Sequence, residues 1–302
     1  MQSSARRELE ESPGASPFPR AEDCTPYLCP VIYGGTREIR LLRSGIFVAS
    51  CAGPYFHGRM NIRYFTLRAW IVASMLTSAA GLSAGPANQL TEEEKAAGWK
   101  LLFDGKTTQG WRSFKKQSFP DQGWVVEEGW LHCLGKGGSK GGGDIITDAE
   151  FDDFDLEWEW KIAPAGNNGV KYFVIETRDQ ALGHEYQMID DEHAQGVDKG
   201  NRKQLTASFY AVLAPTNAPI KPAGEVNRSR ILVKGDRVEH WLNGQKVLEY
   251  ECGSEVVKAA VAASKFKNTA GFGNKVRGHI LLTDHNDNAW FRNVKIRELT
   301  GK

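Results

Sequence analysis

Residues 155–162 read DLEWEWKI, and this stretch decides the fold class. Its apolar side chains fall on every second position, at Leu156, Trp158, Trp160 and Ile162, with Asp, Glu or Lys between them. A period of two puts alternate side chains on opposite faces of a β-strand. The stretch therefore predicts a strand of an antiparallel sheet that has one buried and one charged face.

Further strand-like runs continue as far as Glu298, separated by Gly, Asn, Asp and Pro. In order they are VKYFVIET, EYQMID, ASFYAVL, RILVKG, VEHWLNG, QKVLEYE, GHILLTDH and WFRNVKIREL. Asn243-Gly244 predicts a two-residue hairpin, because both of its central positions favour positive φ, and Gly235-Asp236 predicts the turn before it. There is no βαβ alternation and no internal repeat, which argues against Rossmann, TIM-barrel and solenoid folds. The pattern is typical of an all-β sandwich.

Two short helices are expected beside the strands. Thr91 and Glu94 form a capping-box sequence, and Gly98 ends the helix that follows. Ser254 is a second N-cap, ahead of EVVKAAVAASKFK with small and apolar residues at helical spacing.

Composition is that of an ordinary globular protein. The 302 residues fit one sandwich of roughly 200–250 residues plus a leader. With 38 basic and 37 acidic residues the formal net charge is +1, so no long-range field indicates nucleic acid or an anionic membrane as partner. Nine Trp, fourteen Phe and eight Tyr suit packing between sheets, and they also suit stacking on sugar rings.

Residues 60–84 follow the pattern of a secretory signal peptide. Two arginines precede an apolar run over 69–76, and small residues follow. We expect cleavage after Ala80, with a cut near Ser83 or Ala84 as the alternative. The run is too short to span a bilayer. The pattern therefore predicts export to the periplasm, the cell envelope or the medium, with no stable membrane span.

Residues 1–59 are rich in Arg, Ser, Pro and Gly and lack clear periodicity. They are either an untranslated extension, with Met60 as the true start, or a disordered tail ahead of an uncleaved signal anchor. Of the five cysteines only Cys133 and Cys252 lie beyond the leader, without CxxC or zinc-site spacing. Export permits one disulfide, but unpaired buried thiols are the expectation.

Five motifs in unbroken order resemble the 3-keto-disaccharide hydrolase domain family. They are FDGKTTQGW, FDDFDLEWEWKI followed by GNNGVKYF, HEYQMIDDEH, VEHWLNGQKVLEYE and GHILLTDHNDNAWFRNVKIREL. The likeness covers residues 98–299. HNDNAWF departs from the family pattern, which more often has Gly after the His and an apolar or acidic residue before the aromatic.

The resemblance implies a concanavalin A-like jelly-roll sandwich of two antiparallel sheets. It also implies an exported enzyme that cleaves glycosides whose sugar carries a 3-ketone, with a sugar oxidoreductase as the partner that supplies this substrate. A ketone at C3 acidifies the hydrogen at C2, so cleavage needs a base, an acid for the leaving group, and an electrophile near the ketone oxygen. No cofactor is certain, and a divalent metal such as calcium or manganese is one candidate for that electrophile. Two carboxylates flanking an oxocarbenium ion, as in ordinary glycosidases, are not required.

The densest group of acid-base side chains is HEYQMIDDEH, over residues 184–193. Its Glu and Gln face one side of the expected strand, its first Asp faces the other, and its last His lies in the adjoining loop. His240 shares a strand face with apolar neighbours, which is typical of a core residue, but its likeness to the family's HWLNG motif implies a place in the site. We predict catalytic roles for Glu185, His240, Asp190 and His193. The alternative is a polar strand whose side chains satisfy loop backbones.

Six further residues are predicted to bind substrate: Gln187, Lys171, Glu157, Glu159, Asp284 and His285. The lysine is either a fixed cation near the ketone or a solvated side chain. The glutamates line the charged face of their strand, which either contacts sugar or is simply solvated. The Asp284-His285 pair ends a strand and suits either an oxygen-rich metal site or loop capping, and capping is favoured.

Two other functions compete with the enzyme. One is a non-catalytic carbohydrate-binding module, which would present its aromatics as an open flat platform instead of gathering polar residues in one pocket. The other is a structural or adhesion domain, for which the sequence offers no positive feature.

Overall fold

The computed structural model describes residues 86–135, 141–196 and 198–299. The chain divides into two units, Met1–Met75 and Leu76–Lys302, and every described residue belongs to the second. The predictions for residues 1–59 and for the leader at 60–84 lie outside the described residues. Within the described ranges, no helix is long and apolar enough to cross a membrane.

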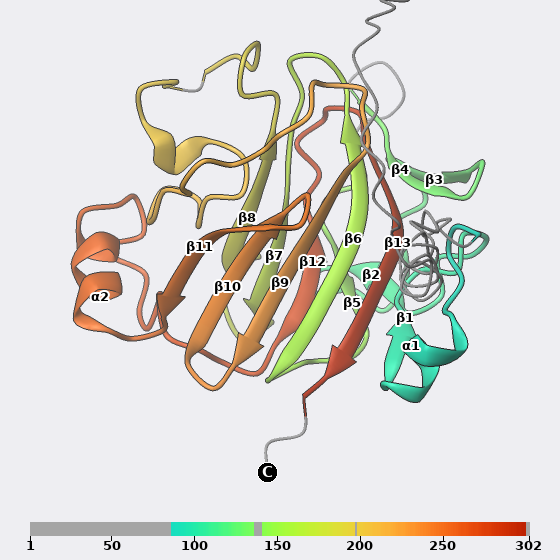
Figure 1. The fold of residues 1–302 in the computed structure, drawn as a ribbon, viewed down its shortest axis with the longest axis horizontal. Helices are drawn as coiled ribbons and strands as arrows, with labels where there is room; N and C mark the ends of the chain where they lie inside the picture. The colour runs from blue at the N-terminus through green and yellow to red at the C-terminus, as the bar shows by residue number, and fades with distance from the viewer. Residues whose placement is uncertain (1–85, 136–140, 197, 300–302) are drawn as a thin grey trace, which may run out of the picture. The chain divides into compact units, whose positions relative to one another are not determined.

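Two antiparallel sheets make up the domain (Figure 1), which confirms the all-β prediction. The larger sheet has the order β11-β10-β9-β6-β13-β4-β3, with β1 paired to β13. Its strands are β1 (Trp99–Leu101), β3 (Trp124–Glu127), β4 (Trp130–Cys133), β6 (Phe154–Ile162), β9 (Asn227–Lys234), β10 (Arg237–Leu242), β11 (Gln245–Glu251) and β13 (Ala289–Glu298). The smaller sheet has the order β2-β5-β12-β7-β8. Its strands are β2 (Trp111–Ser113), β5 (Ile145–Thr147), β7 (Asn167–Val174), β8 (His184–Ile189) and β12 (His279–Leu282).

Strand β6 lies in the middle of the larger sheet, between β9 and β13. Its apolar row is buried as the alternation predicts, with Trp158 and Trp160 at most 1% exposed. The Trp160 indole donates to Ser229 Oγ at 2.8 Å, so its polar atom is satisfied inside the core. Removing one such ring would cost roughly 3–5 kcal/mol of stability, which makes this row the centre of the fold.

The expected turns and caps are present. Asn243 and Gly244 join β10 to β11 with φ of 48° and 85°, as the hairpin signal predicts. Helix α1 (Glu92–Ala96) carries the complete capping box of Thr91 and Glu94. Helix α2 (Glu255–Ala262) begins after its Ser254 cap but ends earlier than the sequence run suggested, and a short 3-10 turn spans Arg202–Gln204.

The strand expected from ASFYAVL, at 207–213, is wrong. This segment forms only isolated bridges, from Phe209 to Tyr186 and to Leu213, because positive φ values of 66° at Ala207 and 62° at Ala211 break the extended backbone. It still follows the free edge of β8, where the Tyr210 amide donates to the Glu185 carbonyl at 3.0 Å.

Cys133 and Cys252 are free and buried, as expected. Burial raises the pKa of both thiols, to about 12 for Cys252, so neither carries a reactive thiolate at neutral pH.

Candidate active site

One hollow on the smaller sheet gathers polar side chains from β7, β8 and two neighbouring segments. It encloses about 120 Å³ and is called the Glu185 hollow below. Its lining residues are Asn167, Lys171, Leu182, Gly183, Glu185, Gln187, Tyr210, Lys265, Phe266 and His285. Tyr186 and His184 point from the same strand into the core, where they contact His240 and Tyr250, so the hollow lies on the sheet's outer face.

Glu185 is the most unusual residue of this hollow. It is only 7% exposed, yet among the described residues its carboxylate accepts no hydrogen bond and lies within 4.0 Å of no Lys, Arg or His nitrogen. Its oxygens are not among the fully buried polar atoms without a partner, so they reach solvent through the hollow. Carboxylates in largely buried positions are normally paired or hydrogen-bonded, which makes this one a candidate for a functional role.

Gly169 makes the room for that carboxylate. It lies on β7 beside the edge strand β8, and a Cβ built there would come within 2.5 Å of Glu185 Oε1. No strained backbone accounts for glycine at this position, since its φ lies outside the left-handed region. The close approach of side chain to backbone is therefore what requires glycine.

Lys171 lies directly opposite Glu185 in the β7–β8 register but turns its ammonium away. Its Nζ is 3.4 Å from Asp144 Oδ2 and 3.3 Å from the Ala181 carbonyl oxygen. Its positive charge is thus already matched by a carboxylate outside the hollow lining.

Gln187 and Asn167 supply amides to the same hollow. Gln187 Nε2 donates to Asn167 Oδ1 at 3.2 Å, and the Asn167 backbone amide donates to Asp287 Oδ2 at 3.1 Å. Amide groups held in this way offer donors and acceptors that match sugar hydroxyls.

The strand-end pair divides between the hollow and the adjoining loop. His285 is exposed and lines the hollow. Asp284 accepts backbone hydrogen bonds from Gly143 and Asn286, both at 2.9 Å, which is the capping role that the sequence favoured.

His240 requires a correction, because the structure does not bring it to the Glu185 hollow. It is 0% exposed and lies between the sheets, on the inward face that it shares with Val238 and Leu242. Nδ1 is 2.9 Å from the Ala207 carbonyl oxygen and Nε2 is 2.7 Å from the Tyr172 hydroxyl. Burial lowers its pKa to about 4, against the effect of the Ala207 hydrogen bond, so the ring is neutral at ordinary pH.

The same core contains a directed chain of hydrogen bonds. The Ala207 carbonyl can only accept, so the neutral His240 ring carries its proton on Nδ1 and accepts from Tyr172 through Nε2. Tyr172 then accepts from Tyr250 at 2.6 Å, which in turn accepts from His184 Nδ1 at 2.8 Å. His184 Nε2 is left as a buried acceptor without a partner. The chain orders the core, and none of its side chains lines the Glu185 hollow.

Asp190 and His193 also lie apart from the Glu185 hollow. Asp190 follows the end of β8 and accepts backbone hydrogen bonds from Ala165 at 2.8 Å and from Glu192 and His193 at 3.1 Å. Burial opposes ionisation of Asp190, but these bonds outweigh it and lower the carboxyl pKa. Its carboxylate therefore closes a loop, and the Glu185 hollow gives no support to the catalytic role predicted for this pair.

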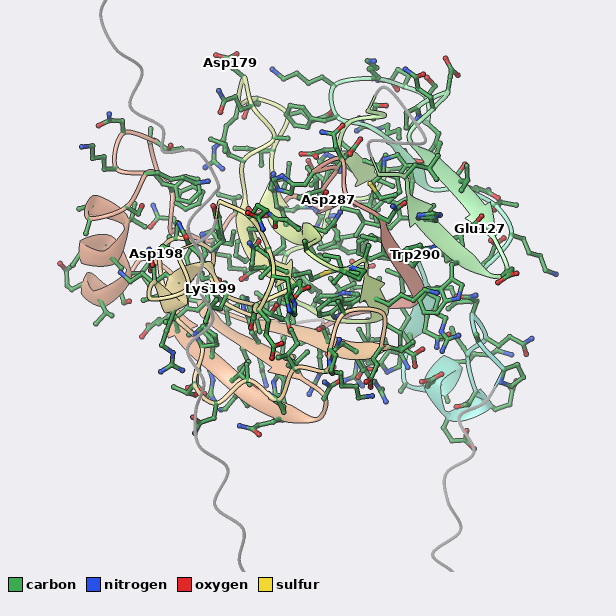
Figure 2. The ribbon with its side chains drawn as sticks, turned by 90° about the horizontal axis from the view of Figure 1, so that it is seen from above. Glu127, Asp179, Asp198, Lys199, Asp287 and Trp290 are labelled. Atoms are coloured by element: carbon green, nitrogen blue, oxygen red, sulfur yellow. The ribbon has the colours of Figure 1, made fainter. Side chains whose placement is uncertain are left out.

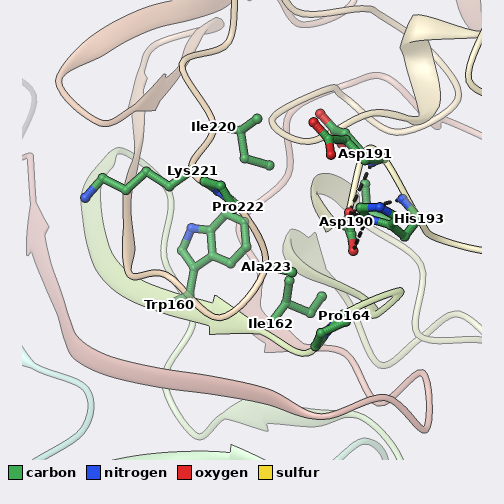
Figure 3. A pocket seen from close by; sticks show the side chains of 12 residues that line it. Trp160, Ile162, Pro164, Asp190, Asp191, His193, Ile220, Lys221, Pro222 and Ala223 are labelled. Carbon is green, nitrogen blue, oxygen red and sulfur yellow. Dashed lines mark hydrogen bonds and ion pairs between the residues drawn. The ribbon is translucent and has the colours of Figure 1, made fainter.

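Figure 3 shows this pair at a second hollow of about 250 Å³. The wall opposite is apolar and includes Trp160, Ile162 and Pro164, with residues 220–223 on a third side. Glu185 does not line this second hollow.

Glu157 and Glu159 lie on the outer face of the larger sheet, so they too are separate from the Glu185 hollow. Glu157 pairs with Arg228, and Glu159 accepts from Arg292 Nε at 2.8 Å. The ion pairs agree with the solvated face that the sequence left open as the alternative. Glu157 also lines a separate hollow of about 600 Å³ on this face, so sugar contact by this pair stays a prediction.

No metal site is formed by the side chains in the described ranges, where no group of three or more His, Cys, Asp or Glu is arranged to hold an ion.

The profile of the 3-keto-alpha-glucoside-1,2-lyase-like domain matches residues 98–297. The chain belongs to this family. It is 32% identical over 247 residues to a 3-keto-disaccharide hydrolase of Bacteroides thetaiotaomicron, a match that covers 72% of this chain and 84% of the relative.

Solved structures agree with membership of the 3-keto-alpha-glucoside-1,2-lyase-like family. A candidate glycosyl hydrolase of Parabacteroides distasonis superposes with a TM-score of 0.64 and 35% identity, covering 70% of this chain and 99% of that one. A second candidate glycosyl hydrolase from the same organism superposes with a TM-score of 0.51 and 25% identity, covering 67% of this chain and 99% of that one. The concanavalin A-like jelly-roll sandwich implied by the motifs is confirmed.

Three polar residues of this family member's hollow were missed by sequence reasoning, and one of them, Asn167, stands in the motif GNNGVKYF. Tyr210 lies in the broken segment beside β8, and Lys265 follows the end of α2. Neither stands in a motif of the resemblance, and the strand-like and helical runs that contain them give no sign of a site. Only the tertiary fold brings them beside Glu185.

Proposed function

We propose that this protein cleaves 3-keto-glycosides, with Glu185 as the base that takes the proton from C2. Family membership makes the chain a carbohydrate-active hydrolytic enzyme. The observation that supports the finer proposal is the buried and unpartnered carboxylate of Glu185, facing a hollow lined by amides and cations. The curated relative's name, 3-keto-disaccharide hydrolase, supports the same substrate class.

The reaction follows from the acidity that a C3 ketone gives to C2. Glu185 takes the C2 proton, and the C–H electron pair forms the C2=C3 bond of an enolate whose charge rests on the ketone oxygen. The enolate then re-forms the ketone, its electron pair forms the C1=C2 bond, and the C1–O bond breaks. The leaving oxygen gains a proton. Water then adds across C1=C2: its oxygen bonds to C1, Glu185 returns its proton to C2, and the proton lost by the water restores the acid. The net products are a free 3-keto-sugar and an alcohol.

The remaining lining residues are assigned by their chemistry. Gln187 and Asn167 offer amides to sugar hydroxyls. Tyr210 and His285 also line the hollow, and we assign protonation of the leaving oxygen to one of them. Burial, together with the negative charge of Glu185, raises the pKa of Tyr210, which keeps its hydroxyl protonated. A sugar oxidoreductase is the class of enzyme that would supply the ketone.

The open aromatic platform of a binding module has little support. Four tryptophans lie on the outer face of the larger sheet or beside it, and each has a cation over its ring: Trp99 with Arg297, Trp130 with Arg292, Trp241 with Arg230, and Trp290 with Lys161, at 4.3–5.5 Å from the ring centres. Figure 2 shows Trp290 near Glu127, at the end of the domain that contains β3 and β4. A cation over the ring competes with sugar for that face, which weakens the case for an open platform.

Turnover of a 3-keto-disaccharide tests the proposal. Wild-type protein, Glu185→Gln and Glu251→Gln are incubated with the oxidised disaccharide and with its unoxidised parent, and released sugar is measured. Glu251 is an exposed glutamate on β11 and serves as the matched control. We expect release from the oxidised sugar only, full activity in the control, and a loss of about 100-fold or more in Glu185→Gln. Turnover by Glu185→Gln equal to that of wild type would show that Glu185 is not the catalytic base.

We also propose export, on the basis of the leader pattern at residues 60–84. N-terminal sequencing of protein recovered outside the cytoplasm should begin after Ala80, or near Ser83 or Ala84. A chain that keeps these residues and sediments with membranes would support the signal-anchor alternative instead.

A further inference from the structure

The Glu185 hollow is lined by two ammonium groups, and they differ in what they contact. Lys171 is held by Asp144 Oδ2 and the Ala181 carbonyl. Lys265 makes no hydrogen bond to any described residue, and no carboxylate of the described ranges lies within 4.0 Å of its Nζ. Lys265 is therefore the lining cation whose charge is not already matched.

The place of Lys265 is fixed by its neighbours. Phe266, the next residue, is buried and stacks on Phe272 with ring centres 4.1 Å apart. The Lys265 ammonium lies over the Tyr210 ring at 4.3 Å from its centre, a cation–π contact at the wall of the hollow. Lys265 is an exposed residue, and its anchored backbone and stacked ammonium place the charge at the wall of the hollow.

Opposite charges line this hollow without forming an ion pair. Glu185 and Lys265 both contribute to its lining, yet no nitrogen–oxygen pair between them comes within 4.0 Å. Burial lowers the pKa of Lys265, while the negative charge of Glu185 acts on it in the opposite sense. An unpaired base and an unpaired cation leave space between them for a bound group that meets both.

We propose that Lys265 is the catalytic cation that binds the C3 ketone oxygen and stabilises the enolate formed when Glu185 removes the C2 proton. This inference rests on the proposed function and adds the electrophile that the reaction needs. The ammonium donates a hydrogen bond to the ketone oxygen and keeps its own proton. As the C2–H electron pair moves into the C2=C3 bond, negative charge grows on that oxygen, where a fixed donor acts most strongly.

The sequence had suggested Lys171 as the cation near the ketone, and the structure favours Lys265 for that role instead. The change follows from the Asp144 contact, because a lysine already paired with a carboxylate offers less charge to a ligand.

The test compares Lys265→Met, Lys265→Arg and the control Lys267→Met. Lys267 is exposed, lies two residues further along and does not line the hollow. Steady-state kcat and KM are measured on a 3-keto-disaccharide, and affinity for the unoxidised disaccharide is measured by calorimetry. We expect Lys265→Met to lower kcat by about 100-fold or more, Lys265→Arg to recover part of it, and Lys267→Met to match wild type. Affinity for the unoxidised sugar, which has no ketone, should change by no more than a few fold in Lys265→Met.

A wild-type kcat in Lys265→Met, with wild-type protein active, overturns the role of Lys265 and leaves the proposed function intact. An equal loss of affinity for oxidised and unoxidised sugar overturns it as well, because that result indicates general sugar binding. Wild-type protein without activity on any 3-keto-disaccharide overturns the proposed function and this inference together. Thermal melting of Lys265→Met should match wild type, since the lysine forms no ion pair that supports the fold.

Discussion

Replacing Gly169 by alanine would displace the Glu185 carboxylate without removing it. The added Cβ would lie 2.5 Å from Oε1, 3.1 Å from Cγ and 3.2 Å from Cδ of Glu185, whereas ordinary contact begins at 3.4 Å. The carboxylate oxygen must therefore retreat by about 0.9 Å. A displacement of about 1 Å at a reacting group costs about 100-fold in rate, or about 2.7 kcal/mol of activation free energy.

The fold itself should tolerate this change. Gly169 does not have positive φ, and alanine in a strand is favoured over glycine by roughly 0.5–1 kcal/mol. We therefore expect kcat on a 3-keto-disaccharide to fall about 100-fold while the melting temperature stays near that of wild type. Gly200→Ala is the control, since its Cβ would meet only the Asp198 carboxylate at 3.1 Å, in an exposed loop.

Wild-type kcat in a folded Gly169→Ala variant would refute the reasoning, because the position of the carboxylate would then not matter. A loss of activity that follows a lower melting temperature would equally count against it.

Two further predictions concern stability and the larger sheet. Burial lowers the pKa of His184 to about 3 and of His240 to about 4, so both resist protonation when folded and accept protons freely when unfolded. The resulting stability is present above pH 6.5 and is lost as the pH falls toward 4, by about 1.4 kcal/mol per pH unit for each ring. Urea unfolding should therefore show a loss on the order of 4 kcal/mol between pH 7 and pH 5, and a flat profile would contradict the neutral hydrogen-bonded chain. Glu159→Gln should leave kcat/KM unchanged and lower the free energy of unfolding by less than about 1 kcal/mol. A tenfold loss of kcat/KM would show that the outer face of the larger sheet contributes to the active site.

The sequence predicted the fold well where the information is local. The alternation around Trp158 sets the buried face of β6, and Asn243-Gly244 specifies a hairpin through backbone conformation alone. The broken segment at 207–213 was missed because positive φ at two alanines is imposed by tertiary contacts and not by alanine itself.

The candidate site was predictable only in part. Glu185 and Gln187 share a face through the same alternation that defines β8, so their meeting could be read from the sequence. His240 was misplaced although its apolar neighbours pointed to the core, since the resemblance to a family motif gave it a role that the packing does not support. Tyr210 and Lys265 reach the hollow through long-range folding, which leaves no local signal.

Removal of the C2 proton is the central claim, and a competition between two labelled substrates tests it most directly. A 3-keto-glycoside with hydrogen at C2 is mixed with the same compound carrying deuterium there, and mass spectrometry follows both during turnover. The hydrogen-bearing substrate should be consumed faster, and Glu185→Gln should consume neither at an appreciable rate. Equal consumption of the two substrates, with the deuterium still present in the released sugar, would contradict proton abstraction at C2.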